Sequence, residues 1–404
     1  MTRERRTMAG LTTMAAWLLL AAGPATAQDN PTPGVTATEI RLGQTMPYSG
    51  PASAYGTIGK VEAAYFAKIN DEGGINGRKI NLISLDDGYS PPKTVEQTRR
   101  LVEQDGVLLT FQNLGTPPNT AIHKYLNQKK VPQLFVATGA TMWGDPEHFP
   151  WTMGWQPSYQ TEAHIYAKYL LQNKPDAKIG ILYQNDDYGK DYVKGLKDGL
   201  GANAAKMIVA EVSYEVMDPT VDSQIVSLKG SGADVFFNVT TPKFAAQAVR
   251  KAYDIDWRPL EILNNVSISI GAVLEPAGLD KSTGLLSAQY YKDPADPATA
   301  QEPAMREWDA FMKKYYPEGN TADAFNVYGY LAAQTMVQVL KQCGNDLTRE
   351  NVMRQAANLN LALPLLQPGI TISTGPKDFF PIKQMRLQRF DGKRWVPFGE
   401  PITG

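Results

Sequence analysis

This chain of 404 residues has few of the side chains that carry metal or redox chemistry. It contains one cysteine, Cys343, and three histidines, His123, His148 and His164. A single cysteine cannot form an intrachain disulfide, and the histidines lack the spacing of metal ligands. The sequence also lacks a phosphate-binding P-loop and a nucleophile elbow of the form G-x-S-x-G. We therefore expect no metal, no cofactor and no catalytic residues.

An excess of charge of one sign is also lacking. The formal net charge is −1 at pH 7, with 40 Lys and Arg against 41 Asp and Glu. Proteins that bind nucleic acid or anionic membranes usually carry a marked excess of Lys and Arg. The near balance of charge gives no reason to expect either partner.

The N-terminus has the features of a secretory signal peptide. Three arginines precede an apolar run at residues 8–22, and a small-x-small cleavage site follows at residues 25–27. The run is short for a bilayer span, and no later apolar run is long enough for one. We expect residues 1–27 to be cleaved, leaving a soluble periplasmic protein. Cys343 lies too far from this leader to be a lipid anchor. An N-terminal membrane anchor is the alternative.

Residues 39–87 have the pattern of a strand, a helix and a second strand. An apolar strand at 40–46 ends in a Pro/Gly turn, apolar residues at helical spacing follow from 58 to 69, and a strand covers 79–85. Such a unit forms a right-handed crossover in a parallel sheet. Ligands of these sheets bind beyond the carboxyl ends of the strands.

Strands and helices continue to alternate along most of the chain. We expect further strands at residues 106–111, 133–137, 178–183, 207–212, 234–239, 261–263 and 285–290, and a C-terminal hairpin at 384–390 and 394–398. Residues 150–158 are rich in Pro, Gly and Trp and are expected to cross between lobes. The alternation predicts an α/β fold with parallel sheets, and the length predicts two lobes.

Several short motifs resemble the leucine/isoleucine/valine-binding protein family, whose members are periplasmic solute-binding proteins of ABC importers. They are Ser49-Gly50-Pro51 with Tyr55-Gly56, the Gly-rich segment 70–77, Asp86-Asp87 and the segment 185–189. The resemblance implies the type I periplasmic-binding-protein fold, in which three crossing strands form a hinge between two Rossmann-like lobes. Lobe I would hold residues 38–158 and 284–380, and lobe II would hold 159–283 and 381–404.

By this resemblance, two loops of lobe I bind a ligand carboxylate. The matching positions are Gly115-Thr116 after the third strand and Gly139-Ala140-Thr141 after the fourth. Thr116 precedes a proline, which predicts that it is a helix N-cap. A carboxylate there would meet free N–H groups at the positive end of a helix. Capping without any ligand is the alternative for both loops.

The resemblance also implies contacts from the facing lobe. Tyr55 and Tyr188 match cleft positions, and Thr240 or Thr241 stands where relatives have a tyrosine. Asn265 stands where relatives that bind α-amino acids have an acidic residue for the ammonium group. Asparagine can accept a hydrogen bond but brings no countercharge, and a buried, unpaired cation is costly.

Two explanations for Asn265 remain. Either Asp186 or Asp187 supplies the missing charge, or the ligand has no ammonium group, which we favour. Aromatic residues of the cleft loops, Tyr89, Trp143 and Phe325 among them, suit an aromatic or hydrophobic carboxylic acid. Plain packing of these rings between the lobes is the alternative, as is capping for the paired aspartates.

The expected function is that of a monomeric periplasmic receptor that closes on a small carboxylate and delivers it to an ABC permease in the inner membrane. A receptor for branched-chain or other hydrophobic amino acids is one alternative. A periplasmic sensor subunit that feeds a membrane receptor is another. A hydrolase using the paired aspartates is disfavoured, because no nucleophile–base pattern accompanies them.

Overall fold

The computed structural model describes residues 32–404, and the expected signal peptide at 1–27 lies outside the described residues. A first sheet is entirely parallel, with strand order β2-β1-β3-β4-β5. Its strands are β1 (Glu39–Met46), β2 (Lys79–Asp86), β3 (Leu109–Phe111), β4 (Gln133–Val136) and β5 (Thr152–Gly154). Strand β5 falls inside the segment expected to be a plain crossing. Its three residues are too few to show an apolar period.

A second sheet has the order β14-β13-β10-β9-β8-β6-β7. Strands β6 to β10 are parallel, whereas at one edge β13 pairs antiparallel with β10 and β14 pairs antiparallel with β13. The bounds are β6 (Ile179–Gln184), β7 (Ile208–Tyr214), β8 (Val235–Val239), β9 (Leu260–Leu263), β10 (Leu286–Gln289), β13 (Gln384–Phe390) and β14 (Trp395–Pro397). A short strand, β15 (Ile402–Thr403), pairs with β13. The predicted α/β class with parallel sheets is confirmed.

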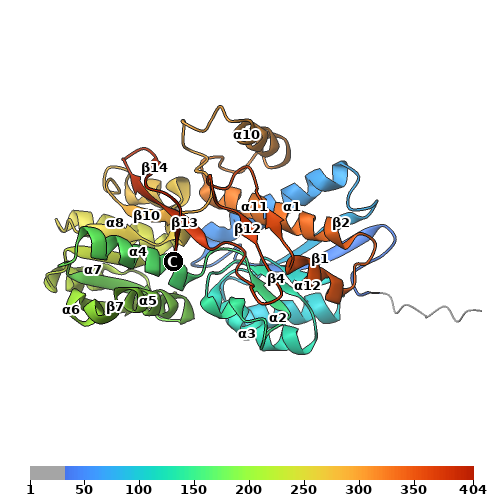
Figure 1. Cartoon of the computed structure of the whole chain (residues 1–404), viewed down its shortest axis with the longest axis horizontal. Coiled ribbons are helices and arrows are strands. Elements are labelled where there is room, and N and C mark those ends of the chain that lie inside the picture. Colours follow the sequence, from blue (N-terminus) through green and yellow to red (C-terminus); the bar gives the residue numbers. More distant parts are fainter. Residues whose placement is uncertain (1–31) are drawn as a thin grey trace, which may run out of the picture. The chain divides into compact units, whose positions relative to one another are not determined.

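Helices accompany both sheets (Figure 1). With the first sheet are α1 (Gly56–Asp71), α2 (Pro91–Glu103), α3 (Thr116–Gln128), α10 (Pro303–Tyr315), α11 (Ala324–Cys343) and α12 (Arg349–Ala356). With the second are α4 (Tyr159–Asn173), α5 (Asp187–Leu200), α6 (Ala204–Met207), α7 (Asp222–Gly230), α8 (Pro242–Asp254) and α9 (Glu275–Ala277). We call these groups lobe one and lobe two.

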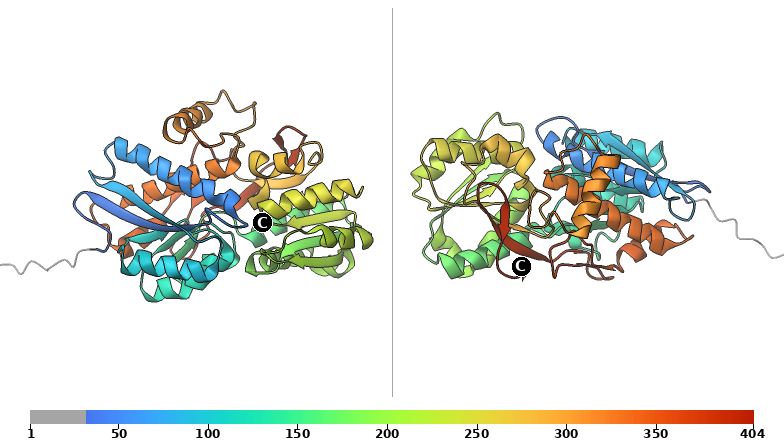
Figure 2. Two further views of the ribbon diagram at one scale, coloured as in Figure 1. Left: turned by 180° about the vertical axis from the view of Figure 1, so that it is seen from behind. Right: turned by 90° about the horizontal axis from the view of Figure 1, so that it is seen from above.

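The chain passes between the lobes three times. It leaves lobe one after β5, returns after β10, and leaves again after the small β11–β12 pair (Asn360–Leu361 and Ile372–Ser373) to form β13. Helix α11, far along the chain, packs against α1. Figure 2 accordingly shows the blue N-terminal elements and the orange α11 on the same side of the molecule.

The lobe boundaries drawn from the resemblance remain a prediction. Strand β10 follows the expected boundary at residue 284, yet it pairs with β9 and β13 in the second sheet. Within residues 32–404, no helix combines the length and the apolar character that a membrane crossing requires.

Candidate ligand-binding cavity between the lobes

A cavity of about 540 Å³, including the part open to solvent, lies where the carboxyl ends of strands from both lobes meet. Lobe one contributes Tyr55, Ile58, Tyr89, Leu114, Gly115, Thr116, Ala137, Phe325 and Tyr328. The crossings and lobe two contribute Gln156, Tyr159, Tyr188, Thr241, Asn265, Val266, Tyr290 and Tyr291.

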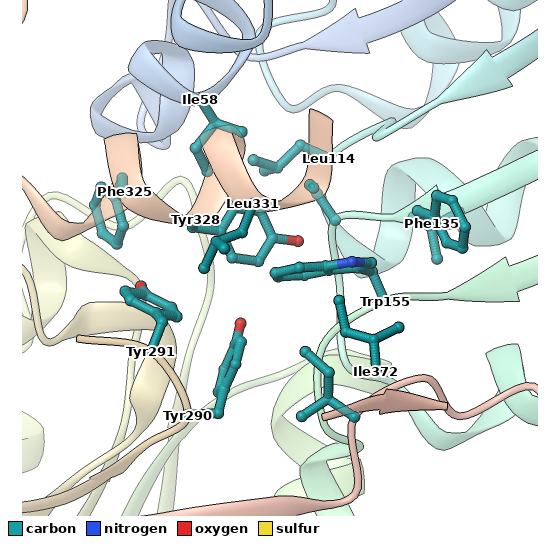
Figure 3. Packing of buried hydrophobic residues seen from close by; sticks show 14 of the residues in the cluster. Ile58, Leu114, Phe135, Trp155, Tyr290, Tyr291, Phe325, Tyr328, Leu331 and Ile372 are labelled. Carbon is teal, nitrogen blue, oxygen red and sulfur yellow. The ribbon is translucent and has the colours of Figure 1, made fainter. Parts of the chain in front are cut away.

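The walls are aromatic and uncharged. Seven tyrosines and Phe325 line the cavity, and none of its described lining residues is Asp, Glu, Lys or Arg. Figure 3 shows how Tyr290 and Tyr291, which follow β10, face Phe325 and Tyr328 of α11. The Tyr55 ring packs 5.1 Å from that of Phe325. The cavity therefore offers ring faces and hydroxyl groups but no fixed charge.

The N-terminus of α3 forms one wall. Gly115 has φ of 97°, and a Cβ atom there would lie 2.4 Å from the Tyr89 ring, so both the turn and the close approach require glycine. The helix begins at Thr116 with Pro117 and Pro118 next, and prolines have no N–H group. Thr116 therefore supplies the one backbone N–H among the first three helical residues.

Thr116 is not the N-cap, and that prediction is wrong by one residue. Gly115 occupies the cap position, because its positive φ already turns the chain into the helix. The Thr116 hydroxyl instead hydrogen-bonds the Thr138 hydroxyl at 2.5 Å. Thr138 also contacts Tyr159 Oη and Trp143 Nε1, each at 3.3 Å. Sequence reasoning missed Thr138, although it lies only two residues after the end of β4.

The paired aspartates hold the loops that carry two cavity tyrosines. Asp87 accepts hydrogen bonds from Tyr89 N at 2.9 Å and from the Thr94 hydroxyl at 2.7 Å. This fixes Tyr89 at φ 61°, a conformation that bulky residues rarely adopt. Asp186 is the N-cap of α5 and accepts from Tyr188 N at 3.0 Å. The capping alternative therefore describes both of these side chains.

Lobe two presents its side of the cavity from the loops after β6, β8 and β9. The Tyr188 hydroxyl donates to the side-chain oxygen of Asn264. Thr241 lines the cavity, whereas the Thr240 side chain turns away and donates to Asn238 Oδ1 at 2.6 Å. Of the two threonines that the sequence offered for this position, Thr241 rather than Thr240 lies at the cavity.

Asn265 begins the turn after β9 and is tied to a buried acid. Its backbone N–H donates to Glu162 Oε1 at 2.7 Å, and the Tyr166 and Tyr192 hydroxyls donate to the same carboxylate at 2.8 and 2.7 Å. Burial raises the pKa of Glu162 to about 7, against these three donors, which favour the ionised form. Glu162 itself does not line the cavity.

Besides Thr240, five predicted site residues lie elsewhere. Gly139, Ala140 and Thr141 of the second loop do not line the cavity, and Thr141 donates through both its N–H and its hydroxyl to Asp191 Oδ2 of lobe two, at 2.8 and 2.9 Å. Trp143 is buried beneath the cavity beside Thr138. Asp187 is exposed at the start of α5. Neither Asp186 nor Asp187 lines the cavity.

Sequence reasoning also missed several residues that line the cavity. Tyr290 and Tyr291 directly follow β10. Residues just beyond the carboxyl end of a parallel strand are the ones expected to contact a ligand. Tyr328 lies one helical turn after Phe325, on the same face of α11. These positions could be read from the sequence, but none of the three tyrosines lies in a recognisable motif.

The lobes touch each other around the cavity. The Tyr55 hydroxyl donates to Val266 O at 2.9 Å, and the Ser269 hydroxyl donates to Asp323 Oδ1 at 2.7 Å. Thr141 and Asp191 form a third bridge. These direct contacts on several sides of the cavity describe a closed arrangement of the two lobes.

Solved structures of low sequence identity share this fold. A branched-chain amino acid ABC transporter protein from Thermus thermophilus with bound valine superposes with a TM-score of 0.82 at 17% identity, covering 92% of this chain and 98% of that one. A fatty acid ABC transporter substrate-binding protein from Thermomonospora curvata gives 0.76 at 20% identity, with coverages of 92% and 94%. The type I periplasmic-binding-protein fold is thereby confirmed.

Sequence comparison agrees with the structural match. The chain is 24% identical over 320 residues to Leu/Ile/Val-binding protein homolog 1 of Brucella abortus, which covers 77% of this chain and 81% of the relative. It is 22% identical over 315 residues to an amino acid binding protein of Pseudomonas aeruginosa, with coverages of 76% and 80%. The model of the family described as periplasmic binding protein matches residues 39–394. The chain belongs to this family of solute-binding proteins.

Proposed function

We propose that this protein is the receptor of an ABC importer and that it closes on a hydrophobic carboxylic acid, with an aromatic acid as the preferred type. The observation that carries the proposal is a cavity lined by seven tyrosines and Phe325 without a charged side chain. Aromatic walls contribute large apolar contact areas and specific ring packing. They suit the apolar part of such a ligand.

The carboxylate is assigned to the N-terminus of α3. There the Thr116 N–H and the positive end of the helix dipole favour an anion, typically by about 0.3–2 kcal/mol for the dipole part. Pro117 and Pro118 leave this end with fewer donors than an ordinary helix start. The hydroxyl groups of Tyr290 and Tyr328, which also line the cavity, supply the remaining donors, because those of Tyr55, Tyr159 and Tyr188 already donate within the protein.

The absence of an acidic lining residue disfavours an ammonium group on the ligand. Asn265 stands at the expected ammonium position with an amide in place of a carboxylate, and Asp186 and Asp187 lie outside the cavity. A buried cation without a direct countercharge typically costs several kcal/mol. The fatty acid-binding protein from Thermomonospora curvata is a carboxylic acid receptor of the same fold, according to its description.

A hydrophobic amino acid is the second candidate ligand. It is favoured by the relatives described as Leu/Ile/Val-binding and amino acid binding proteins, and by the valine in the structure from Thermus thermophilus. We place this candidate second because the uncharged lining offers no countercharge for the ammonium group of an amino acid.

Isothermal titration calorimetry on the purified mature protein tests the proposal. We expect 3-phenylpropanoate or 4-methylpentanoate to bind in the micromolar range or tighter, and the corresponding alcohols, which lack the carboxylate, to bind at least tenfold more weakly. Binding of phenylalanine or leucine together with no binding of either amino-free acid would reverse the ranking. Loss of uptake of the ligand in a strain that lacks the protein would favour transport, and unchanged uptake would favour sensing.

A further inference from the structure

We propose that Asn265 is a fixed hydrogen-bond acceptor in the cavity, oriented by Glu162 and Gln289, and that the ligand carries an uncharged hydrogen-bond donor, a hydroxyl group, in addition to its carboxylate. This inference rests on the proposed function. It specifies which polar group the apolar acid must bear.

The orientation of the Asn265 amide follows from its neighbours. Nδ2 donates to Ala288 O at 2.7 Å and to Gln289 Oε1 at 3.2 Å. The backbone oxygen can only accept, and Gln289 Oε1 is identified as the oxygen because it accepts from Tyr290 N at 2.8 Å. A flipped Asn265 amide would place oxygen against oxygen. The nitrogen is therefore committed to the protein, and Oδ1 is left for the cavity that Asn265 lines.

Glu162 fixes the backbone of the same residue. It is 2% exposed, and its Oε1 atom accepts from Asn265 N at 2.7 Å. The two tyrosine hydroxyls that share this carboxylate come from α4 and α5, so Asn265 is anchored to the framework of lobe two. Ala288 and Gln289 anchor its side chain to the end of β10, close to the second crossing. Glu162 and Gln289 are thus positioning residues for Oδ1.

An acceptor held in this way selects for a donor. A buried acceptor that the ligand leaves without a partner loses its hydrogen bonds to water and gains nothing in return. An acid without a hydroxyl group would leave Oδ1 in that state once the lobes close. Sites that hydrogen-bond a ligand hydroxyl discriminate strongly against analogues that lack it.

The test compares four acids that share one carbon skeleton, by calorimetry on the full mature protein. 3-Phenylpropanoate has no donor, phenyllactate has a hydroxyl beside the carboxylate, 3-(4-hydroxyphenyl)propanoate has one on the ring, and phenylalanine has an amino group. We expect one of the two hydroxyl-bearing acids to bind about tenfold more tightly than both 3-phenylpropanoate and phenylalanine. The acid that does so identifies the donor and its position.

Two variants assign the preference to residues. Asn265→Ala should reduce the preference for the hydroxyl-bearing acid to less than about threefold. Glu162→Gln, which exchanges one acceptor oxygen for a donor, should reduce the same ratio in part. Glu261→Gln is the matched control, because Glu261 is also a buried acid of lobe two but bonds only Asn238, at 2.9 Å. This control should leave the ratio unchanged.

The outcomes separate the inference from the proposed function. If 3-phenylpropanoate or phenylalanine binds as tightly as both hydroxyl-bearing acids, the inference is wrong and the carboxylic acid receptor remains. If none of the four acids binds and 4-methylpentanoate also fails, the proposed function and the inference fall together. If Glu162→Gln weakens every acid equally, Glu162 has a structural role only and its positioning role is refuted.

Discussion

Buried carboxyl groups are the residues whose chemistry depends most on their surroundings in this protein. Glu162 and Glu261 are both buried in lobe two, and neither has a cationic partner among its hydrogen bonds. Burial raises the pKa of each carboxyl to about 7, because removal from water disfavours the charged form. Glu162 accepts a hydrogen bond from the backbone N–H of Asn265, a residue that lines the cavity. The Glu261 carboxyl group, by contrast, accepts a side-chain hydrogen bond only from Asn238.

The raised pKa of Glu261 predicts a pH dependence of stability. The folded protein holds this proton more tightly than the unfolded chain, so its contribution to stability is present below about pH 4.5 and is lost as the pH rises to about 7. Glu261→Gln removes the titration. Relative to wild type, the variant should gain stability between pH 5 and pH 8, measured by urea unfolding at both values. An equal difference at the two pH values would contradict this prediction.

At the scale of elements, α5 connects the lobes on one side of the cavity. Asp191 in this helix accepts two hydrogen bonds from Thr141 of lobe one and one from Gln160 Nε2 of α4 at 2.5 Å. Thr141 was expected to bind the ligand. The structure gives it a partner across the cleft instead, in a position to favour the closed arrangement.

Asp191→Asn should therefore weaken ligand binding without changing ligand preference. The amide replaces one acceptor oxygen by a donor, so the closed form loses part of its stabilisation, and the dissociation constant should rise about three- to tenfold for every ligand. Calorimetry measures the constants, and small-angle scattering measures the closure. Asp198→Asn is the control, because Asp198 pairs only with Lys194 on the same helix. A change in the order of ligand preference would contradict the interpretation.

The whole molecule depends on its C-terminal strands. Strand β13 pairs with β10 along four residues, and β14 brings the buried Trp395, whose Nε1 donates to Ile268 O at 2.9 Å. These residues come last in the chain but complete the sheet that carries Asn265 and Tyr188. Lobe two is therefore not finished until the chain has crossed between the lobes for the third time.

A chain that ends at residue 383 should not fold into a stable lobe two. It loses the buried Leu387, Phe390 and Trp395, each worth about 1.5–3 kcal/mol, a sum comparable with the typical stability of about 5–15 kcal/mol. Circular dichroism on heating should show no cooperative transition, or one lowered by more than about 10 °C. A chain that ends at residue 400 removes only β15 and should lose a few degrees at most. Similar melting of the two truncated chains would refute the prediction.

The sequence alone determined the class of fold and the family, because both rest on local signals. Apolar strands such as β1 and β6 could be predicted within a residue or two, and the motifs around Ser49 and Asp86 are contiguous in the chain. The α3 end of the site was predicted from the resemblance to the family, which matches the contiguous pair Gly115 and Thr116 to a ligand-binding loop.

The tertiary structure decided which side chains face the ligand cavity. Thr116 and Thr141 follow neighbouring strands in the same way, yet one lines the cavity and the other bonds Asp191. Tyr188, Tyr290 and Tyr328 come from distant parts of the chain and line one cavity only when both lobes and their crossings have formed. Spacing along the chain reports which face of an element a residue occupies, whereas partners across the cleft depend on how the lobes close.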